Sequence, residues 1–328
     1  MKKLLTFTLM LSLLFTLTSS KKQFTIYMIG DSTMADKDMK KAPEERGWGM
    51  VLQGYFTENV VVDNHAVNGR SSKSFIKEGR WQKVLDRMKP GDYLVIQFGH
   101  NDEKFKDSMR VTRPWYEFAD NYRTYILGAK AKGATPIVMN CVARRNFYNA
   151  QTKVEIDDEA LRSANRDKYP VSDEKINSDT LVDTHGDYAK VPAVIAREMN
   201  VPYIDANKIS TDLENGLGVE GSRELHMIKY NGKDNTHYNV YGARLMASLL
   251  VDEMARACPE LKPYVRHYDY VVSAKGRGNY LTLQEAVDAI PANGKKTQVL
   301  ILDGTWQKPA VAKGKKPKYI KYCGAKIK

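Results

Sequence analysis

Short apolar runs alternate with longer amphipathic segments along most of this chain. The runs are four to seven residues long and nearly continuous, which is typical of strands buried on both faces: 24–29, 60–63, 92–98, 136–142 and 202–206. Four further segments carry apolar residues at spacings of three and four, which predicts helices: 74–88, 114–133, 185–200 and 239–256. The alternation predicts an α/β fold with a parallel sheet, right-handed crossovers and helices on both faces.

Four polar blocks fall at one edge of the predicted sheet. The ligand site of such a sheet lies at the carboxyl ends of its strands. GDS, with Ser32, follows the first run, VNGRS follows the second, and GHND follows the third. DNTH lies just before the last predicted helix. The blocks therefore place serine and histidine side chains in the same region as several amide and carboxyl groups.

These blocks can supply every group that an acyl-transfer site requires. Ser32 is the candidate nucleophile, His237 the base, and Asp234 the carboxylate that orients the imidazole. The main-chain N–H groups of Ser32 and Gly69 and the side-chain amide of Asn101 are the candidate oxyanion donors. Each residue alone is more typical of a turn or a helix cap, and only their joint occurrence favours catalysis. The Gly-x-Ser-x-Gly elbow of α/β-hydrolases is absent, because position 34 is Met.

In these four blocks the chain resembles the SGNH (GDSL-like) hydrolases, over about residues 24–256. The stretches IGDSTMAD, RGWGMVLQGYF, NHAVNGRSSKSF and QFGHND are most similar to rhamnogalacturonan acetylesterases and related bacterial pectin deacetylases. The resemblance implies a flavodoxin-like three-layer sandwich and a Ser-His-Asp mechanism that needs no metal or cofactor. It also implies removal of O-acetyl groups from pectin, with rhamnogalacturonan as the favoured substrate.

Three other functions stay open at this point. The first is deacetylation of another polysaccharide such as xylan, and the second is hydrolysis of a lipid or thioester. The third is a non-catalytic polysaccharide-binding protein on the same scaffold. A lipid substrate is less favoured because the loops that carry the blocks are polar and no apolar lid is evident.

The first twenty residues have the order of a secretory signal peptide: Lys2 and Lys3, an apolar run, and then Ser19-Ser20. The run is about fifteen residues long, against the roughly twenty of a membrane-spanning helix, so a cleaved signal is favoured over an anchor. We therefore expect a secreted or periplasmic protein without a membrane span in its mature chain.

Residues 21–260 then form the hydrolase domain, in which the polar stretch 143–183 is either a functional surface insertion or a disordered loop.

The segment 264–328 begins a new pattern of strand, amphipathic helix and strand. It resembles the N-terminal stretch of pectin methylesterases, which opens a right-handed parallel β-helix. Because one coil of a repeat fold leaves its faces uncovered, we expect an incomplete β-helix-like remnant without a proper core of its own. The last 25 residues hold eight Lys and no acid, with no β-helix pattern. Truncation of a two-enzyme chain is one interpretation, and a basic tail that binds anionic pectin is the alternative.

The net charge of +12 is concentrated at the two ends of the chain. Lys2 and Lys3 contribute two units and the tail eight, so 12 − 2 − 8 leaves +2 for residues 21–303. A nearly neutral body argues against nucleic acid as a partner. The three cysteines, Cys141, Cys258 and Cys323, fit neither a disulfide framework nor a zinc site, although one disulfide stays open. The oligomeric state has no signal in the sequence.

Overall fold

Two parallel β-sheets organise the chain in the computed structural model, which describes residues 23–149, 176–315, 317–324 and 327. The larger sheet has the strand order β2-β1-β3-β4-β5, the flavodoxin-like order. Its strands are β1 (Phe24–Gly30), β2 (Val60–Asn64), β3 (Tyr93–Gln97), β4 (Thr135–Met139) and β5 (Tyr203–Ile204). Each of the five predicted strands is present, and the parallel α/β fold is confirmed.

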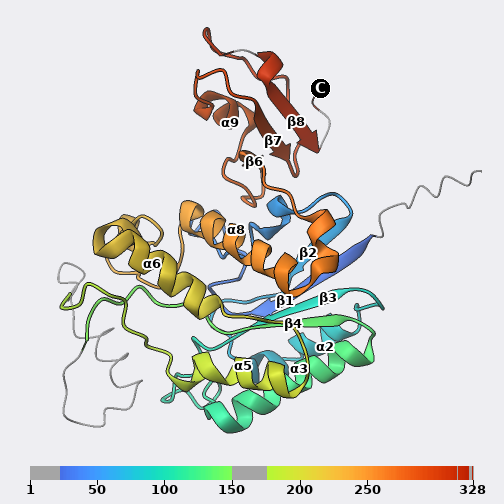
Figure 1. Ribbon diagram of the computed structural model, residues 1–328, viewed down its shortest axis with the longest axis vertical. Helices are drawn as coiled ribbons and strands as arrows, with labels where there is room; N and C mark the ends of the chain where they lie inside the picture. The colour runs from blue at the N-terminus through green and yellow to red at the C-terminus, as the bar shows by residue number, and fades with distance from the viewer. Residues whose placement is uncertain (1–22, 150–175, 316, 325–326, 328) are drawn as a thin grey trace, which may run out of the picture.

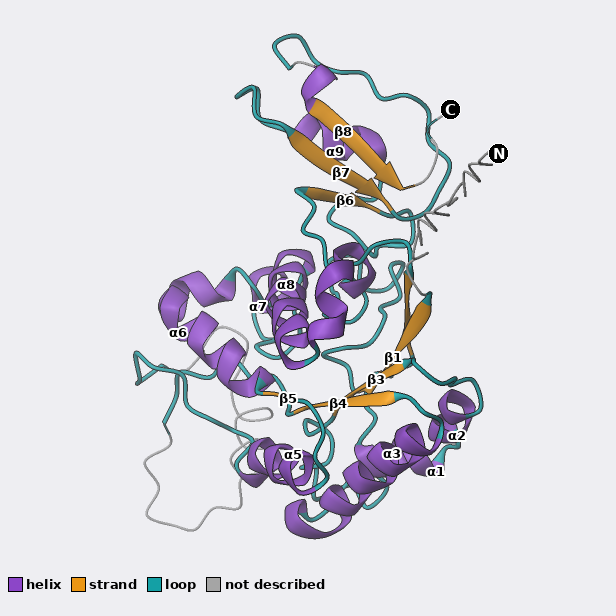
Figure 2. Cartoon of the chain, turned by 45° about the vertical axis from the view of Figure 1, so that its right-hand side comes forward, coloured by secondary structure: helices purple, strands orange, loops and turns teal. Residues whose placement is uncertain are grey.

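Helices cover both faces of this sheet, as Figures 1 and 2 show. Alternate residues of β1 belong to different cores, with Ile26 and Met28 on one face and Tyr27 and Ile29 on the other. The first face packs against a short 3₁₀ turn and two helices: η1 (Leu52–Tyr55), α6 (Ala206–Arg223) and α8 (Val240–Ala257). The second packs against α1 (Ser72–Lys77), α2 (Arg80–Leu85), α3 (Ala119–Ala131) and α5 (Asp187–Glu198).

Glycines account for the main differences from the predicted helices. The helix expected over 74–88 is divided into α1 and α2 by Gly79, whose φ of +67° is left-handed. The segment 114–133 begins with a single π turn, η2 (Pro114–Phe118), before α3. Helix α6 was not predicted, because glycines interrupt its periodicity and one of them, Gly218, kinks it. Its start is fixed by Asp205, whose side chain accepts the Lys208 N–H.

The C-terminal segment forms a second, smaller unit after the turn η3 (Pro259–Tyr264). Its parallel sheet has the order β6-β7-β8, with β6 (Tyr270–Val272), β7 (Thr297–Ile301) and β8 (Ile320–Gly324). Helix α9 (Leu283–Ala289) covers the sheet, and η4 (Pro317–Tyr319) precedes β8. The expected strand, helix and strand are present, but the lysine-rich tail also contributes β8, which the sequence did not predict. A β-helix is not confirmed.

The expectation that this unit lacks a core was wrong. Buried side chains of β6, β7 and α9 form a cluster: Val272, Leu283, Ala286, Val287, Ile290, Val299 and Ile301. The unit also packs against the loop that follows β1, where the buried Arg46 donates its Nε–H to the carbonyl of Gly276 at 2.8 Å. Arg277 lies 3.7 Å from Asp36, four residues after Ser32. The C-terminal unit therefore packs against the larger α/β domain instead of standing apart from it.

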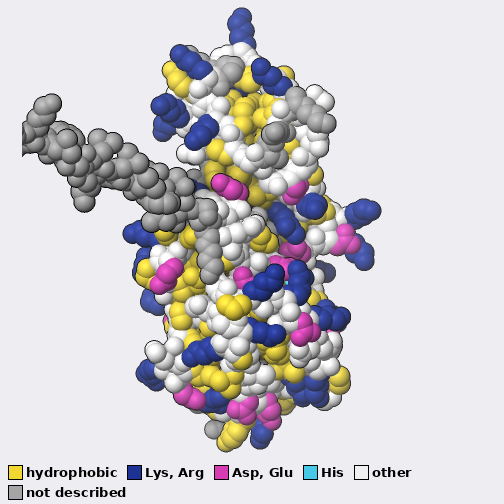
Figure 3. Space-filling view, turned by 90° about the vertical axis from the view of Figure 1, so that its right-hand side faces the viewer, with side chains coloured by type: hydrophobic (Ala, Val, Ile, Leu, Met, Phe, Trp, Pro, Cys, Tyr) yellow, Lys and Arg dark blue, Asp and Glu magenta, His cyan; other side chains and the backbone are white. Residues whose placement is uncertain are grey.

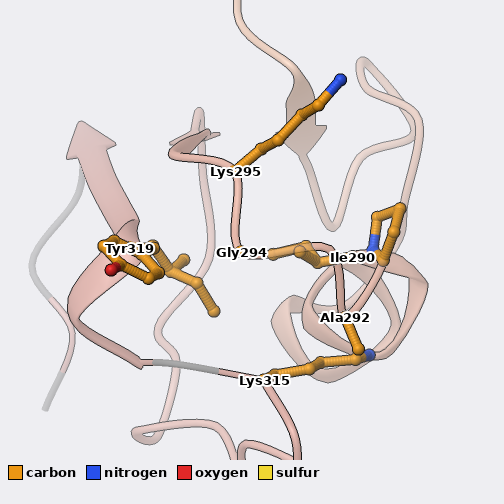
Figure 4. A pocket seen from close by; sticks show the side chains of 8 residues that line it. Ile290, Ala292, Gly294, Lys295, Lys315 and Tyr319 are labelled. Carbon is orange, nitrogen blue, oxygen red and sulfur yellow. The ribbon is translucent and has the colours of Figure 1, made fainter.

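The charged side chains visible on the C-terminal unit, the upper part of Figure 3, are mostly basic, whereas both charges mix over the body below. Figure 4 shows a small hollow in this unit between α9 and the segment before β8, lined by residues that include Ile290, Lys295, Lys315 and Tyr319. The ammonium of Lys315 donates to the carbonyls of Val287 and Asp288, near the C-terminal end of α9. This lysine therefore caps the helix as well as adding charge.

Two sequence predictions concern the membrane and the thiols. The proposed signal peptide, residues 1–20, lies outside the described residues and stays a prediction. In the described part of the chain, no helix has both the length and the apolar character required to cross a bilayer. Cys141, Cys258 and Cys323 are free, and burial raises the pKa of the Cys141 thiol well above its usual value.

Candidate active site

Ser32, His237 and Asp234 form a continuous hydrogen-bonded chain at the carboxyl edge of the large sheet. The Nε2 of His237 lies 2.8 Å from the Oγ of Ser32, and its Nδ1 lies 2.8 Å from Oδ2 of Asp234. Ser32 lies just beyond β1, and the other two residues lie in the loop before α8. The structure thus brings together the three side chains that the sequence singled out, across 205 residues in the case of Ser32 and His237.

The Asp234 loop fixes both the carboxylate and the tautomer of the imidazole. Oδ1 of Asp234 accepts the main-chain N–H groups of Thr236 and His237, both at 3.0 Å. Burial opposes ionisation, but the hydrogen bond and charge of His237 and these N–H groups lower the pKa of Asp234 overall. An ionised carboxylate only accepts, so Nδ1 of His237 carries the proton and Nε2 presents a lone pair to Ser32. This is the arrangement that a general base requires.

The nucleophile turn is tied to its neighbours by a buried lysine. The Nζ of Lys37 donates to the Ser32 carbonyl at 2.6 Å and to Oδ1 of Asn68 at 2.9 Å. It also forms an ion pair of 2.6 Å with Glu45, and its side chain is 2% exposed. Because Asn68 directly precedes Gly69, this ammonium joins the nucleophile turn to the turn that carries a predicted oxyanion donor. This role of Lys37 was not predicted from the sequence.

Gly69 lies in a tight turn at the end of the second polar block. The Arg70 N–H donates to the Val67 carbonyl at 3.2 Å and closes the turn, and Gly69 is its third residue with φ of +75°. A type II turn requires a positive φ at this position, which explains the glycine. The Val67 N–H in turn donates to the carbonyl of Gly30 at 3.0 Å, so the block lies beside the end of β1.

Asn101 follows β3 and is 2% exposed. Its Nδ2 donates to the Arg70 carbonyl at 3.1 Å, which joins it to the Gly69 turn. Between β3 and Asn101, Gly99 has φ of +152°, and a Cβ there would lie 2.8 Å from the Sγ of Cys141. The backbone therefore reaches Asn101 only with glycine at this position. All five predicted site residues belong to one connected region.

A buried polar cluster lies directly behind the nucleophile. Oδ2 of Asp31 lies 3.2 Å from Nδ1 of His100, while Oδ1 accepts the main-chain and side-chain donors of Thr33. Burial lowers the pKa of His100 to about 4. Burial alone would raise the pKa of Asp31, but His100 and the Thr33 hydrogen bonds lower it to about 2. The His100 ring contacts that of His185, whose Nδ1 bonds to Glu103 at 2.9 Å.

The His100 environment predicts a pH dependence of stability. Between pH 6.5, the ordinary pKa of histidine, and about 4, the unfolded chain binds a proton at His100 that the folded chain does not. This group therefore lowers the free energy of unfolding as the pH falls through that window, by about 3 kcal/mol in all. Asp102, whose pKa burial raises from the ordinary 3.8 to about 7, acts in the opposite sense across this whole window.

Comparison with a variant isolates the histidine contribution. We expect the difference in unfolding free energy between wild type and His100→Gln, measured by urea denaturation, to shrink by about 2 kcal/mol from pH 7.5 to 4.5. A constant difference for His100→Gln would show that His100 is not held neutral by burial.

Comparison with known proteins identifies the family. A family model described as GDSL-like lipase/acylhydrolase matches residues 26–250. This chain belongs to that family. It is therefore a carboxylic ester hydrolase. The chain is 32% identical to the rhamnogalacturonan acetylesterase RhgT of Bacillus subtilis (strain 168), and the match covers 78% of this chain and 98% of RhgT.

Two further relatives of this GDSL-like acylhydrolase also come from Bacillus subtilis. It is 32% identical to the probable rhamnogalacturonan acetylesterase YesY, over 69% of this chain and 89% of YesY. Its fold is similar to the crystal structure of YxiM, with a TM-score of 0.54 and 27% identity, over 72% of this chain. The match spans 57% of the YxiM chain, less than two thirds of its length.

Several supporting side chains of this GDSL-like acylhydrolase were missed in the sequence, and they share one property. These side chains are charged and buried, although they lie in polar loops whose sequence is typical of solvent-exposed surface: Asp31, Lys37 and Arg145. Arg145 bonds to the side chain of Asn235, between Asp234 and Thr236, and so supports the histidine loop.

Much of the insertion expected over 143–183 lies outside the described residues. Within the described residues, no group of three or more His, Cys, Asp or Glu could hold a metal ion.

Proposed function

We propose that this protein is a secreted carbohydrate O-acetylesterase that removes acetyl groups from pectin, with rhamnogalacturonan as its substrate. The observation that carries the proposal is the hydrogen-bonded chain from Asp234 through His237 to Ser32. The relatives RhgT and YesY support the polysaccharide. The signal-like first twenty residues support export, which a polymer too large to enter the cell requires.

The geometry supports a two-step acyl transfer. Oγ of Ser32 attacks the acetyl carbonyl while Nε2 of His237 takes its proton. The tetrahedral oxyanion accepts hydrogen bonds from the main-chain N–H groups of Ser32 and Gly69 and from Nδ2 of Asn101. The imidazolium then donates its proton to the departing sugar oxygen, leaving an acetyl-enzyme. A water molecule, deprotonated by His237, releases acetate by the reverse sequence.

Acetate release from a panel of polymers tests the substrate. We expect kcat/KM on acetylated rhamnogalacturonan to exceed that on acetylated xylan and acetylated homogalacturonan by about tenfold or more, because hydroxyl-specific contacts discriminate between sugars. Ser32→Ala is the matched control and should release no acetate from any polymer above background. A preference for xylan would refute the pectin assignment while leaving the esterase assignment intact. Binding of every polymer without turnover would favour the non-catalytic alternative.

A further inference from the structure

The guanidinium of Arg110 lies beside both residues that complete the proposed oxyanion hole. Its Nη1 lies 3.4 Å from Oδ1 of Asn101. On the other side, a methyl group placed on Gly69 would lie 3.8 Å from the same Nη1, so the guanidinium also borders the Gly69 turn. The side chain of Arg110 is 30% exposed, in contrast with the buried Asn101. One cation therefore contacts this region from the solvent side.

The chemistry of its two neighbours determines the orientation of the Asn101 amide. A guanidinium can only donate, so the amide atom facing Arg110 must be the oxygen. The main-chain carbonyl of Arg70 can only accept, so the atom facing it must be the nitrogen. Nδ2 carries two hydrogens, and the Arg70 carbonyl takes one of them. The second N–H is then available to a reacting carbonyl, and a flipped amide would present an oxygen to it instead.

The loop that carries Arg110 is fixed at several points. Arg110 pairs with Asp107 through Nε at 2.5 Å. Two residues further on, Thr112 donates its N–H to the carbonyl and its hydroxyl to the carboxylate of the buried Asp102. Lys73 donates to two main-chain carbonyls on either side of Arg110. These contacts hold the guanidinium over the residue next to Asp102, which is Asn101.

We propose that Arg110 is a positioning residue of the oxyanion hole, which holds the Asn101 amide so that its free N–H faces the developing oxyanion. The inference rests on the proposed acyl-transfer function of this site. It assigns to Arg110 an effect on the transition state and none on the affinity for the ester, because the oxyanion forms only as the carbonyl is attacked. The effect acts through Asn101 and should disappear when that amide is absent.

A double-mutant cycle on p-nitrophenyl acetate tests this dependence. We expect Asn101→Ala to lower kcat by about 10²-fold and Arg110→Ala by about tenfold, each with little change in KM. In the Asn101→Ala background, Arg110→Ala should cost nothing further, because residues that act as a unit are not additive. Arg110→Lys keeps a donor and a charge and should recover part of the loss.

Arg113→Ala provides the matched control. Arg113 lies on the same loop and pairs with Glu117 at 2.7 Å, and within the described residues it has no hydrogen bond to Asn101. Its loss should leave kcat unchanged. Multiplied losses in the double variant, or an unchanged kcat in Arg110→Ala, would overturn the proposal. A raised KM for acetylated rhamnogalacturonan with normal turnover of p-nitrophenyl acetate would instead make Arg110 a contact for the substrate carboxylate. The small ester reports on the chemistry whichever polysaccharide is the substrate, so a wrong substrate assignment would not affect this test.

Discussion

Ser32→Ala and His237→Ala should each lower kcat for ester hydrolysis on the order of 10⁴-fold or more. The reason is geometric: Nε2 of His237 lies 2.8 Å from Oγ of Ser32, and the hydroxyl attacks the acetyl carbonyl only as the imidazole takes its proton. Because they act as a unit, the Ser32→Ala/His237→Ala double variant should be no slower than either single variant. Initial rates of acetate release, corrected for the uncatalysed reaction, measure all three.

The fold of these variants needs its own measurement. Ser32 and His237 are both partly exposed, so truncation should leave the core intact, and the thermal midpoint should move by no more than a few degrees. Thr236→Ala is a suitable neighbour control, because Thr236 bonds to Asp234 through its main-chain N–H, which alanine keeps. Retention of more than a tenth of wild-type activity by Ser32→Ala or His237→Ala would contradict the triad.

The large sheet could be predicted because its strands are buried on both faces. The run that forms β1 is almost continuously apolar, which distinguishes it from a strand with one face in solvent. Its C-terminal end is marked by the polar block that follows. The predicted site residues follow from the same logic, since a parallel sheet gathers the residues after each strand at one edge. Ser32 and Asn101 follow the adjacent strands β1 and β3 for this reason, although 69 positions separate them.

The supporting residues could not be predicted, because their roles depend on distances between loops. Lys37 joins Ser32 to Asn68 across the ends of the paired strands β1 and β2, and Arg110 reaches Asn101 from a loop that Thr112 ties to Asp102. In the sequence, Arg110 and Arg113 are equivalent arginines of one polar loop, and only one of them touches the site. The sequence alone does not indicate whether a charged side chain is solvated or paired with a residue of another loop.

In the C-terminal unit, the lysine-rich composition led to a predicted tail where the structure has the strand β8. The lysines around β8 favour a solvated tail, yet Tyr322 and Ile320 pack against the small core between those lysines. Alternation over so short a segment is a weak signal when Lys and Gly flank it. Parallel pairing with β7 then supplies the hydrogen bonds that the sequence pattern could not indicate.

Asp234→Asn should lower kcat by about 10³-fold, less than loss of Ser32, because the turn is kept while the tautomer is reversed. The amide oxygen can still accept the N–H groups of Thr236 and His237, so the loop should hold its shape. The amide nitrogen, however, would face Nδ1 of His237 and donate to it. That contact favours the proton on Nε2, where it points at Oγ of Ser32 and leaves no lone pair to take the serine proton.

Nitrogen NMR of the imidazole distinguishes this cause from simple loss of charge. In the wild type, the proton of neutral His237 should reside on Nδ1, and in Asp234→Asn it should move to Nε2. Asp234→Glu is the control, since it keeps a carboxylate that can only accept and should keep the wild-type tautomer even where its longer side chain slows turnover. Full activity in Asp234→Asn would mean that Asp234 only caps its turn. A slow variant with the wild-type tautomer would mean that the negative charge, which stabilises the imidazolium formed as Ser32 attacks, is what the reaction requires of Asp234.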